Sequence, residues 1–328
     1  MNPLLQVEDL TVEFHTNANR FRAVEGLSLS IHPGEIVGLV GESGSGKTVT
    51  ALCIMRLADP RAEIVSGRIC FREENLLAKS EAEMRLVRGR RIAMIFQEPM
   101  TALNPSYTVG DQVAEVYRYH LNTRRSEAKQ RAIEMLDRVK MPSPRAMYGK
   151  YAHEISGGMR QRVMIAAALA CKPDLLIADE PTTALDVSIQ AQILTLLREL
   201  QREMGMAVLF VSHNLEVVAE LCKRVAVIYG GKLVEVGDVD ALFERPAHPY
   251  TEGLLRSIPR RRQTLRPIAG TIFEPHAPPS GCRFHPRCPY VQESCKEKTP
   301  ILRQVTDARA QDNTHAGHSV SCHFPLIQ

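Results

Sequence analysis

Residues 41–48 read GESGSGKT, and this segment constrains the fold more than any other part of the chain. It fits the pattern G-x-x-x-x-G-K-S/T, directly after the apolar segment EIVGLV and directly before the helical pattern TVTALCIMRLA. Glycines let the backbone curl until successive N–H groups face one point, and the N-terminus of the next helix adds its positive dipole end. The segment therefore predicts a phosphate-binding loop between a buried strand and a helix.

Each residue of this loop has an expected part in holding a nucleotide. Lys47 would reach the β- and γ-phosphates, and the Thr48 hydroxyl would bind Mg²⁺. The rest of the loop would hold phosphate oxygens, a part we assign to Gly41, Ser43, Gly44, Ser45 and Gly46. A glycine-rich turn that binds nothing is the alternative, and the complete pattern between strand and helix argues against it.

Strands and helices alternate along much of the chain. Short β-branched runs closed by Gly, Pro or polar residues predict buried strands at 35–41, 91–97, 174–180, 206–213 and 224–230. Apolar residues at helical spacing predict helices at 48–58, 157–171 and 187–204. This alternation indicates an α/β fold with a mostly parallel sheet. The helical segment 106–155 breaks the alternation and is expected to be an insertion into that core.

The composition changes near residue 245. Residues 246–328 hold 11 of the 20 prolines, six of the eleven histidines and four of the eight cysteines. We therefore expect two domains, 1–245 and 246–328. The net charge of +4 is too small to argue for nucleic acid as a partner. The beginning of the chain lacks the pattern of a signal peptide, and its longest apolar run, 163–171, is far shorter than the roughly 20 residues that span a bilayer. We expect a cytoplasmic protein whose cysteines stay reduced.

Two further segments carry residues suited to phosphate chemistry. The apolar run DLLIADE ends in Asp179 and Glu180. Beside a phosphate loop the first carboxylate would hold Mg²⁺ and the second would polarise an attacking water, although two acids at a strand end are often only a solvated loop. In HEISGGMRQR, Ser156, Gly157 and Gly158 precede a long helix, and such a start is either an anion site or an ordinary helix N-cap.

Taken together and in this order, the segments of residues 1–245 resemble the ATP-binding subunit of an ABC transporter. The resemblance is carried by GESGSGKT, Gln97 in FQEPMTALNP, ISGGM at 155–159, the strand 175–180, ALD at 184–186 and His213 in VSHN. It implies a P-loop ABC ATPase core, with a mostly parallel sheet, antiparallel N-terminal strands and a helical insertion. It also implies ATP and Mg²⁺ as ligands and ATP hydrolysis as the reaction.

In that family two subunits face each other head to tail, and each ATP lies between the phosphate loop of one and the Ser-Gly-Gly of the other. Carried over to this chain, Ser156, Gly157 and Gly158 would contact the ATP of the partner subunit. Asp186 would help to join the two sites. The family usually has Leu and Gln at the two ends of this segment, whereas this chain has Ile155 and Met159.

The resemblance assigns four more residues to the ATP site. Gln97 would sense the metal as a further Mg²⁺ contact and relay its state to a membrane partner through the helical insertion. His213 would hold the γ-phosphate and the attacking water. The next residue in this chain is Asn214, where the family usually has Asp. An aromatic residue near the N-terminus usually stacks on adenine, and Phe14 is our first choice with Phe21 second.

The C-terminal part resembles the extension of the oligopeptide, dipeptide and nickel importer ATPases, through RPAHPYTEGLLRSIP at 245–259 and GCRFHPRCP at 281–289. This implies an ATPase that energises peptide uptake from the cytoplasmic face of the inner membrane. The implied partners are two membrane-spanning permeases, a second related ATPase and an extracytoplasmic solute-binding protein, with no nucleic acid. The alternatives are import of nickel or another small solute, and ABC-type ATPases that act on DNA or ribosomes. A third possibility is a metal or redox sensor built on the tail.

Four cysteines crowd the tail with the spacing C-x5-C-x6-C-x26-C: Cys282, Cys288, Cys295 and Cys322. The segment lacks a long apolar periodic run, and disulfides are disfavoured in the cytosol. The spacing lacks the tight cysteine pairs of structural zinc sites, so it favours a 4Fe–4S cluster held by these four thiolates, most simply as a structural clamp on the tail. Zinc is the alternative, with His285 or His323 as substitute ligands.

Overall fold

The computed structural model describes residues 2–16, 19–98, 102–183, 185–258, 267–305 and 317–327. Residues 99–101 of the segment FQEPMTALNP, Ala184 of ALD and Pro259 lie outside the described residues. The chain divides into two compact units, the first made of residues 1–31, 36–77 and 210–328 and the second of 32–35 and 78–209. Each unit is built from segments that are distant in the sequence.

The first unit combines sheet strands with short helices. Its strands are β1 (Leu5–His15), β2 (Arg20–Ile31), β3 (Ile36–Val40), β4 (Ala62–Phe71), β5 (Glu74–Asn75), β9 (Arg224–Tyr229), β10 (Lys232–Asp238), β11 (Arg303–Gln304) and β12 (Ser319–Val320). Its helices are α1 (Lys47–Met55), α9 (Leu215–Leu221), α10 (Val239–Glu244), α11 (Pro249–Arg256), the short 3₁₀ helix His285–Arg287 and α12 (Glu293–Glu297). The 3₁₀ helix Leu76–Ala78 lies at the boundary between the units.

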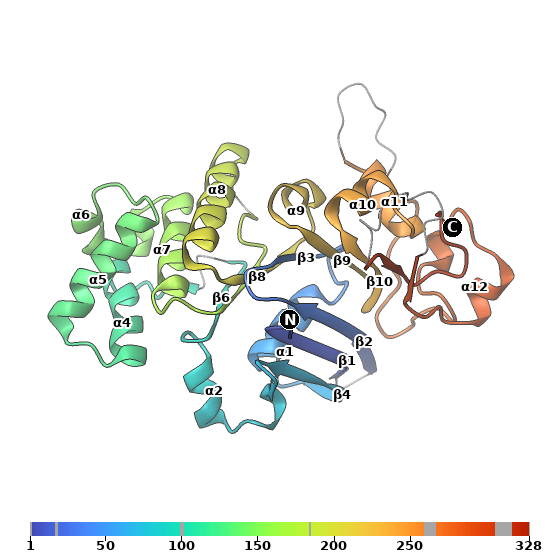
Figure 1. The fold of residues 1–328 in the computed structure, drawn as a ribbon, viewed down its shortest axis with the longest axis horizontal. Helices are drawn as coiled ribbons and strands as arrows, with labels where there is room; N and C mark the ends of the chain where they lie inside the picture. Colours follow the sequence, from blue (N-terminus) through green and yellow to red (C-terminus); the bar gives the residue numbers. More distant parts are fainter. Residues whose placement is uncertain are drawn as a thin grey trace. The chain divides into compact units, whose positions relative to one another are not determined.

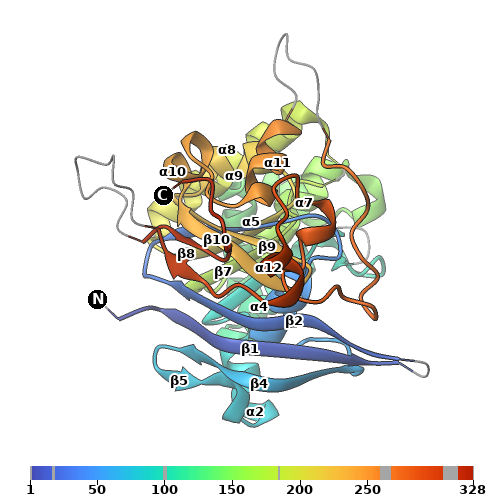
Figure 2. The same cartoon turned by 90° about the vertical axis from the view of Figure 1, so that its right-hand side faces the viewer.

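The N-terminal strands form a four-stranded sheet in the order β2-β1-β4-β5, which Figure 2 shows below the rest of the first unit. All of its described strand pairs are antiparallel. Leu5, Val7, Leu10 and Val12 of the central strand β1 are buried, and the register shifts near Asp9. This shift keeps apolar side chains on the packed face on both sides of the irregularity, as a β-bulge does.

In the larger sheet of the first unit, β11-β12-β10-β9-β3 follow one another, and β3 runs parallel to β9. The strand β10 turns back on β9 as an antiparallel hairpin, and β12 from the C-terminal tail pairs with β10. Four of the five residues of β3 are buried. A strand that is apolar throughout rather than alternating is covered on both faces, which places the phosphate loop at the end of a rigid core strand.

The second unit holds the remaining elements. They are α2 (Glu81–Val87), β6 (Ile92–Ile95), α4 (Val109–Leu121), α5 (Arg125–Arg138), α6 (Pro144–Tyr148), the 3₁₀ helix Ala152–Glu154, α7 (Gly157–Leu169), β7 (Leu175–Asp179) and α8 (Val187–Met204). The strand β8 (Ala207–Ser212) spans the boundary between the units. In the second unit, β7 is next to β8, and β6 pairs with β7 in parallel. All five residues of β7 are buried.

The helices α4, α5, α6 and α7 gather into one group in the second unit (Figure 1). The helix α4 begins at Thr108, whose side chain accepts a hydrogen bond from the Asp111 N–H, an ordinary N-cap. The helix α5 buries Ala128, Ala132 and Met135, which share one face at helical spacing. The helices α4, α5 and α6 occupy the stretch 106–155, whose sequence breaks the alternation of strand and helix.

The predicted fold class is confirmed. The five predicted core strands appear as β3, β6, β7, β8 and β9, and the three predicted helices as α1, α7 and α8. The larger sheet carries parallel pairs, and the N-terminal strands are antiparallel. Within the described ranges, no helix has the length and apolar character needed to cross a membrane.

Candidate functional site

The phosphate loop leaves β3 at Gly41 and enters α1 at Lys47, as the sequence predicts. A Cβ atom on Gly41 would lie 2.1 Å from the carbonyl oxygen of Ile228, so only glycine fits where the loop passes β9. Gly46, the N-cap of α1, has φ of 101°, and a Cβ there would lie 2.6 Å from the carbonyl oxygen of Ala23. The glycines thus allow a close passage and a left-handed turn that other residues would not tolerate.

Two polar side chains of this loop, Lys47 and Ser45, are buried. The Lys47 ammonium is buried and donates to the carbonyl oxygens of Gly41 at 2.8 Å and Glu42 at 3.0 Å. No side chain caps the N-terminus of α1. The Ser45 hydroxyl is buried and has no hydrogen-bond partner among the described residues. Buried polar groups are usually paired, so this hydroxyl fits a ligand oxygen.

A second set of candidate residues meets at the end of β7. Asp179 is its last residue and is 2% exposed, and Glu180 follows at 8% exposed with a φ of 46°. The Gln97 amide donates to the Glu180 carboxylate at 3.1 Å, and the Thr183 hydroxyl donates to the same oxygen at 2.9 Å. Strained backbone of this kind at a non-glycine residue is concentrated at functional sites. The two donors hold the carboxylate in one orientation.

Thr183 is a contact that sequence reasoning missed. It lies three residues after Glu180, in a turn closed by the hydrogen bond from the Thr183 N–H to the Glu180 carbonyl at 3.2 Å. Pro181, at the second position of this turn, is the sequence signal that could have found it, because proline favours that position. Gln97, 83 positions earlier, has no such local signal, and only the family resemblance pointed to it.

Ser156 is the N-cap of α7, and its side chain accepts a hydrogen bond from the Met159 N–H at 3.4 Å. Ser156 and Gly157 are exposed. A Cβ atom on Gly158 would lie 2.8 Å from the Ile189 side chain, so this glycine lets the start of α7 approach α8. Asp186 is the N-cap of α8 but makes no side-chain capping hydrogen bond. Ser156 is thus both an ordinary cap and an exposed helix start.

His213 follows β8 and is exposed, on the first unit. Asn214 caps α9, because its side-chain oxygen accepts from the backbone N–H groups of Glu216 and Val217. An aspartate would accept the same hydrogen bonds, so this departure from the family pattern leaves the local cap intact. Phe14 and Phe21 are cross-strand partners whose rings stack at 5.4 Å, and both are half-buried.

Two family models match different parts of the chain. Residues 24–183 match the family model described as ABC transporter, and residues 234–295 match the C-terminal region of oligopeptide/dipeptide transporters. A probable peptide ABC transporter ATP-binding protein of Sinorhizobium fredii is 49% identical over 97% of this chain and 94% of its own length. The chain belongs to the ABC transporter family.

Other members of this family support the same assignment. The dipeptide transport ATP-binding protein DppD of Escherichia coli is 45% identical to this ABC ATPase, over 98% of this chain and 97% of that protein. Among solved structures, the dimeric ATP-binding cassette MJ0796 in a post-hydrolysis state, bound to ADP and Pi, has a TM-score of 0.65 and 26% identity. The match covers 72% of this chain and 98% of that one.

Membership of the ABC ATPases implies ATP and Mg²⁺ as ligands, and the residues present fit both. Lys47 and the unpartnered Ser45 hydroxyl suit phosphate oxygens. Thr48, Asp179 and Gln97 carry the hydroxyl, carboxylate and amide oxygens that Mg²⁺ prefers, together with substrate phosphates and water. Bound Mg²⁺ would neutralise phosphate charge during hydrolysis.

The four tail cysteines of this ABC ATPase do lie around one cavity. It is lined by His248, Pro249, Cys282, Phe284, His285, Cys288, Tyr290, Cys295, Cys322, His323 and Phe324. The Cys282 N–H donates to the Cys295 carbonyl at 2.8 Å, which joins two of the cysteine-bearing segments. The predicted neighbourhood of the four thiols is therefore present, and all eight cysteines of the chain are free.

The predicted 4Fe–4S cluster, however, is wrong. The described part of the chain, which includes Cys282, Cys288, Cys295 and Cys322, contains no group of three or more His, Cys, Asp or Glu that could hold a metal ion. The cavity volume is about 10 Å³, room for one water at most. Burial raises the pKa of Cys282 and Cys288, and raises that of Cys322 to about 11.

The zinc alternative fails on the same finding. The histidines considered as substitute ligands hydrogen-bond to backbone carbonyls. The Nδ1 atom of His285 lies 3.0 Å from the Cys282 oxygen, and the Nε2 atom of His323 lies 2.8 Å from the Lys298 oxygen.

Polar contacts and strand pairing hold the tail instead. Glu235 on β10 is fully buried, and its carboxylate accepts from the backbone N–H groups of Ala247 at 2.7 Å and His248 at 2.9 Å. The His318 Nε2 atom lies 2.7 Å from the same carboxylate. Next to His318, β12 pairs with β10. These contacts were invisible to sequence reasoning because β12 has two residues and carries no periodic pattern.

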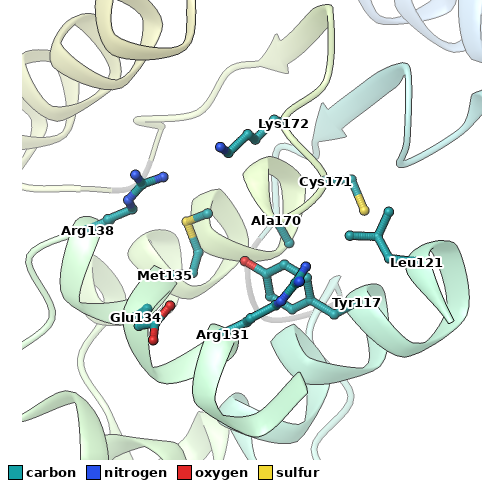
Figure 3. Close-up of a pocket in the computed structure, with 9 residues that line it drawn as sticks. All are labelled: Tyr117, Leu121, Arg131, Glu134, Met135, Arg138, Ala170, Cys171 and Lys172. Atoms are coloured by element: carbon teal, nitrogen blue, oxygen red, sulfur yellow. The ribbon is translucent and has the colours of Figure 1, made fainter. Parts of the chain in front are cut away.

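A larger cavity of about 500 Å³ lies among α4, α5 and the end of α7 in the second unit (Figure 3). Its lining is Tyr117, Leu121, Arg131, Glu134, Met135, Arg138, Ala170, Cys171 and Lys172. Arg131 pairs with Glu127 at 2.7 Å, and Arg138 pairs with Glu203 at 3.0 Å. The lining contains none of the residues assigned to ATP, and its arginines already have carboxylate partners.

Proposed function

We propose that this chain is the ATP-hydrolysing subunit of a membrane ABC importer that takes up di- or oligopeptides. The relatives at 45–50% identity over nearly the whole chain are named peptide or dipeptide transport proteins. The match of residues 234–295 to the oligopeptide/dipeptide transporter C-terminal region supports the same cargo class over nickel. The short helical insertion and the extension of this family argue against an ATPase that acts on DNA or ribosomes.

The observation that carries the catalytic proposal is the oriented Glu180 carboxylate. With hydrogen bonds from Gln97 and Thr183 fixing it, Glu180 polarises the water that attacks the γ-phosphate. Asp179 holds Mg²⁺ with Thr48 and Gln97. Lys47 releases the loop carbonyls that it now contacts and binds the β- and γ-phosphates, while the loop N–H groups hold the remaining oxygens.

The proposal includes a head-to-tail pair of ATPase subunits. At the start of α7, the exposed Ser156 and Gly157, together with the half-buried Gly158, contact the γ-phosphate of the ATP held by the partner's phosphate loop. Asp186 joins the two sites. His213 holds the γ-phosphate and the attacking water, and Phe14 stacks on adenine with Phe21 behind it. The partner is a second, related ATPase, so the pair is a heterodimer.

The complete machine contains two permease subunits that span the inner membrane, with this chain bound to their cytoplasmic face. An extracytoplasmic binding protein delivers the peptide, which never touches this chain. Gln97 couples the ATP site to the permease through the helical segment 106–155. Residues 1–245 are the ATPase domain and 246–328 the extension, a division supported by the two family matches.

The test is the pair Glu180→Gln and Lys47→Ala in the assembled transporter. Glu180→Gln is expected to bind ATP normally and to hydrolyse it roughly 10²- to 10⁴-fold more slowly, because the carboxylate that takes the proton of water is lost. Lys47→Ala is expected to weaken ATP binding itself. Peptide uptake into proteoliposomes is expected to stop with both.

Glu199→Gln, an exposed carboxylate on α8 that pairs with Lys140, is the matched control and is expected to behave as wild type. Wild-type ATP hydrolysis by Glu180→Gln would refute the catalytic assignment. ATP hydrolysis stimulated by another solute and not by peptides would refute the cargo.

A further inference from the structure

The C-terminal extension contacts the phosphate loop directly through Arg287. The guanidinium donates to both oxygens of the Glu42 carboxylate, at 2.7 Å and 3.0 Å. Glu42 is the second residue of the loop, and the two residues are 245 positions apart in the sequence. The Arg287 side chain is 6% exposed. Glu42 is half-buried, and the two-point arginine–carboxylate contact fixes the orientation of both groups.

Aromatic residues hold this ion pair in place. The Tyr250 hydroxyl accepts a hydrogen bond from the Glu42 N–H at 2.9 Å, so the extension binds both the backbone and the side chain of Glu42. The Arg287 guanidinium also lies over the Tyr229 ring, 5.7 Å from its centroid, and the rings of Tyr229 and Tyr250 are 4.6 Å apart. Burial alone would lower the pKa of Arg287, but its hydrogen bonds to Glu42 and Tyr229 raise it above its ordinary value, so the arginine stays charged.

A second residue of the extension, Arg283, contacts the turn after β9 that adjoins the phosphate loop. Arg283, four residues before Arg287, donates to the Gly230 carbonyl and to the Glu25 carboxylate. The neighbouring Gly231 N–H donates to the Ser45 carbonyl of the phosphate loop at 2.9 Å. Residues of the extension therefore support the loop at its first turn and, through the turn after β9, near its end.

We propose that Arg287 is a positioning residue for ATP, which acts through Glu42 to keep the phosphate loop in its binding shape. The Glu42 carbonyl accepts a hydrogen bond from the Lys47 ammonium at 3.0 Å, so a shift of Glu42 displaces the lysine that meets the β- and γ-phosphates. Arg287 also neutralises the Glu42 carboxylate. Without it, a half-buried negative charge in the loop would repel a triphosphate.

Both effects predict a change in nucleotide affinity rather than in the chemical step. We expect Arg287→Gln in the full-length chain to raise the Kd for Mg-ATP about tenfold, because the charge-assisted two-point contact to Glu42 is lost and part of its contribution reaches the loop. In the assembled transporter, the KM for ATP should rise by a similar factor with kcat nearly unchanged. Arg287→Lys keeps the charge but not the two-point contact, and its Kd should lie between those of the wild type and Arg287→Gln.

The role of Glu42 is tested by a double-mutant cycle. Glu42→Gln removes the charge that Arg287 neutralises, so Arg287→Gln should weaken binding much less in that background than alone. Arg303→Gln is the matched control, because Arg303 lies in the same extension and donates to the carbonyl oxygens of Cys322 and His323 in the tail. It should leave the Kd for ATP unchanged.

Three results would overturn the proposal. The first is an unchanged Kd in Arg287→Gln. The second is a loss of equal size in the wild-type and Glu42→Gln backgrounds, which would show that Arg287 does not act through Glu42. The third is a loss of ATP affinity that Arg303→Gln shows as well and that is accompanied by an equal fall in kcat. This result would mean that the extension only stabilises the fold. None of these outcomes would affect the assignment of Glu180, because that residue is tested by the rate of hydrolysis.

Discussion

Replacement of Glu235 by glutamine is expected to release the C-terminal tail from the rest of the first unit. The carboxylate is fully buried and receives three hydrogen bonds, from the N–H groups of Ala247 and His248 and from His318. Glutamine has the same shape but only one acceptor oxygen, so its NH₂ group must face at least one of these donors. The variant therefore loses a hydrogen bond to a charged acceptor and leaves a buried N–H unpaired.

The size of the effect follows from these contacts. Loss of one charge-assisted hydrogen bond costs about 1.5–3 kcal/mol, and an unpaired buried donor costs a further 1–3 kcal/mol, so we take about 3 kcal/mol as a conservative sum. If the tail opens locally, this corresponds to roughly a 100-fold increase in the population of the open form.

Hydrogen–deuterium exchange measures that opening. The reporters are the amides of Ser321 and Leu326, which donate to the carbonyls of Val234 and Ala247. Their exchange is expected to accelerate about 100-fold in Glu235→Gln, while amides of β1 keep their wild-type rates. Glu244→Gln, an exposed glutamate on α10, is the control. Unchanged tail rates, or an equal acceleration in β1, would refute the reasoning.

Two other predictions concern assembly and pH. Ser156→Arg is expected to impair ATP binding at the partner subunit's phosphate loop more than at its own. Nucleotide crosslinking to each subunit separately measures this difference. An equal loss at both sites would contradict the head-to-tail pair. Burial lowers the pKa of His248 to about 4, so its contribution to stability is complete above about pH 6.5 and is lost as the pH falls toward 4. The variant His248→Asn keeps a hydrogen-bond acceptor for the Tyr250 N–H. Between pH 7 and pH 5, the thermal unfolding midpoint of this variant should fall less than that of the wild type. An equal fall in both proteins would contradict this assignment.

The tail shows where sequence reasoning failed. Crowded cysteines in a segment without apolar periodicity suggested that a metal must hold it. The structure supplies a different support, in which a buried glutamate, two arginines and a two-residue strand attach the tail to the first unit. Most of these contacts join residues that are far apart in the sequence, such as Glu235 and His318, 83 positions apart. No local pattern announces which buried acid will meet which distant donor.

The sequence by itself determined the α/β class, the core strands and helices, and the position of the phosphate loop. These are local properties, because hydrophobic periodicity selects helix or strand, and the glycines at 41 and 46 permit a backbone path that other residues would block. Only the tertiary structure decided that Thr183 and Gln97 orient Glu180, and that Arg287 and Tyr250 hold Glu42. Most of these contacts join residues from distant parts of the chain, and they exist because packing of the core brings side chains together that the order of the residues keeps apart.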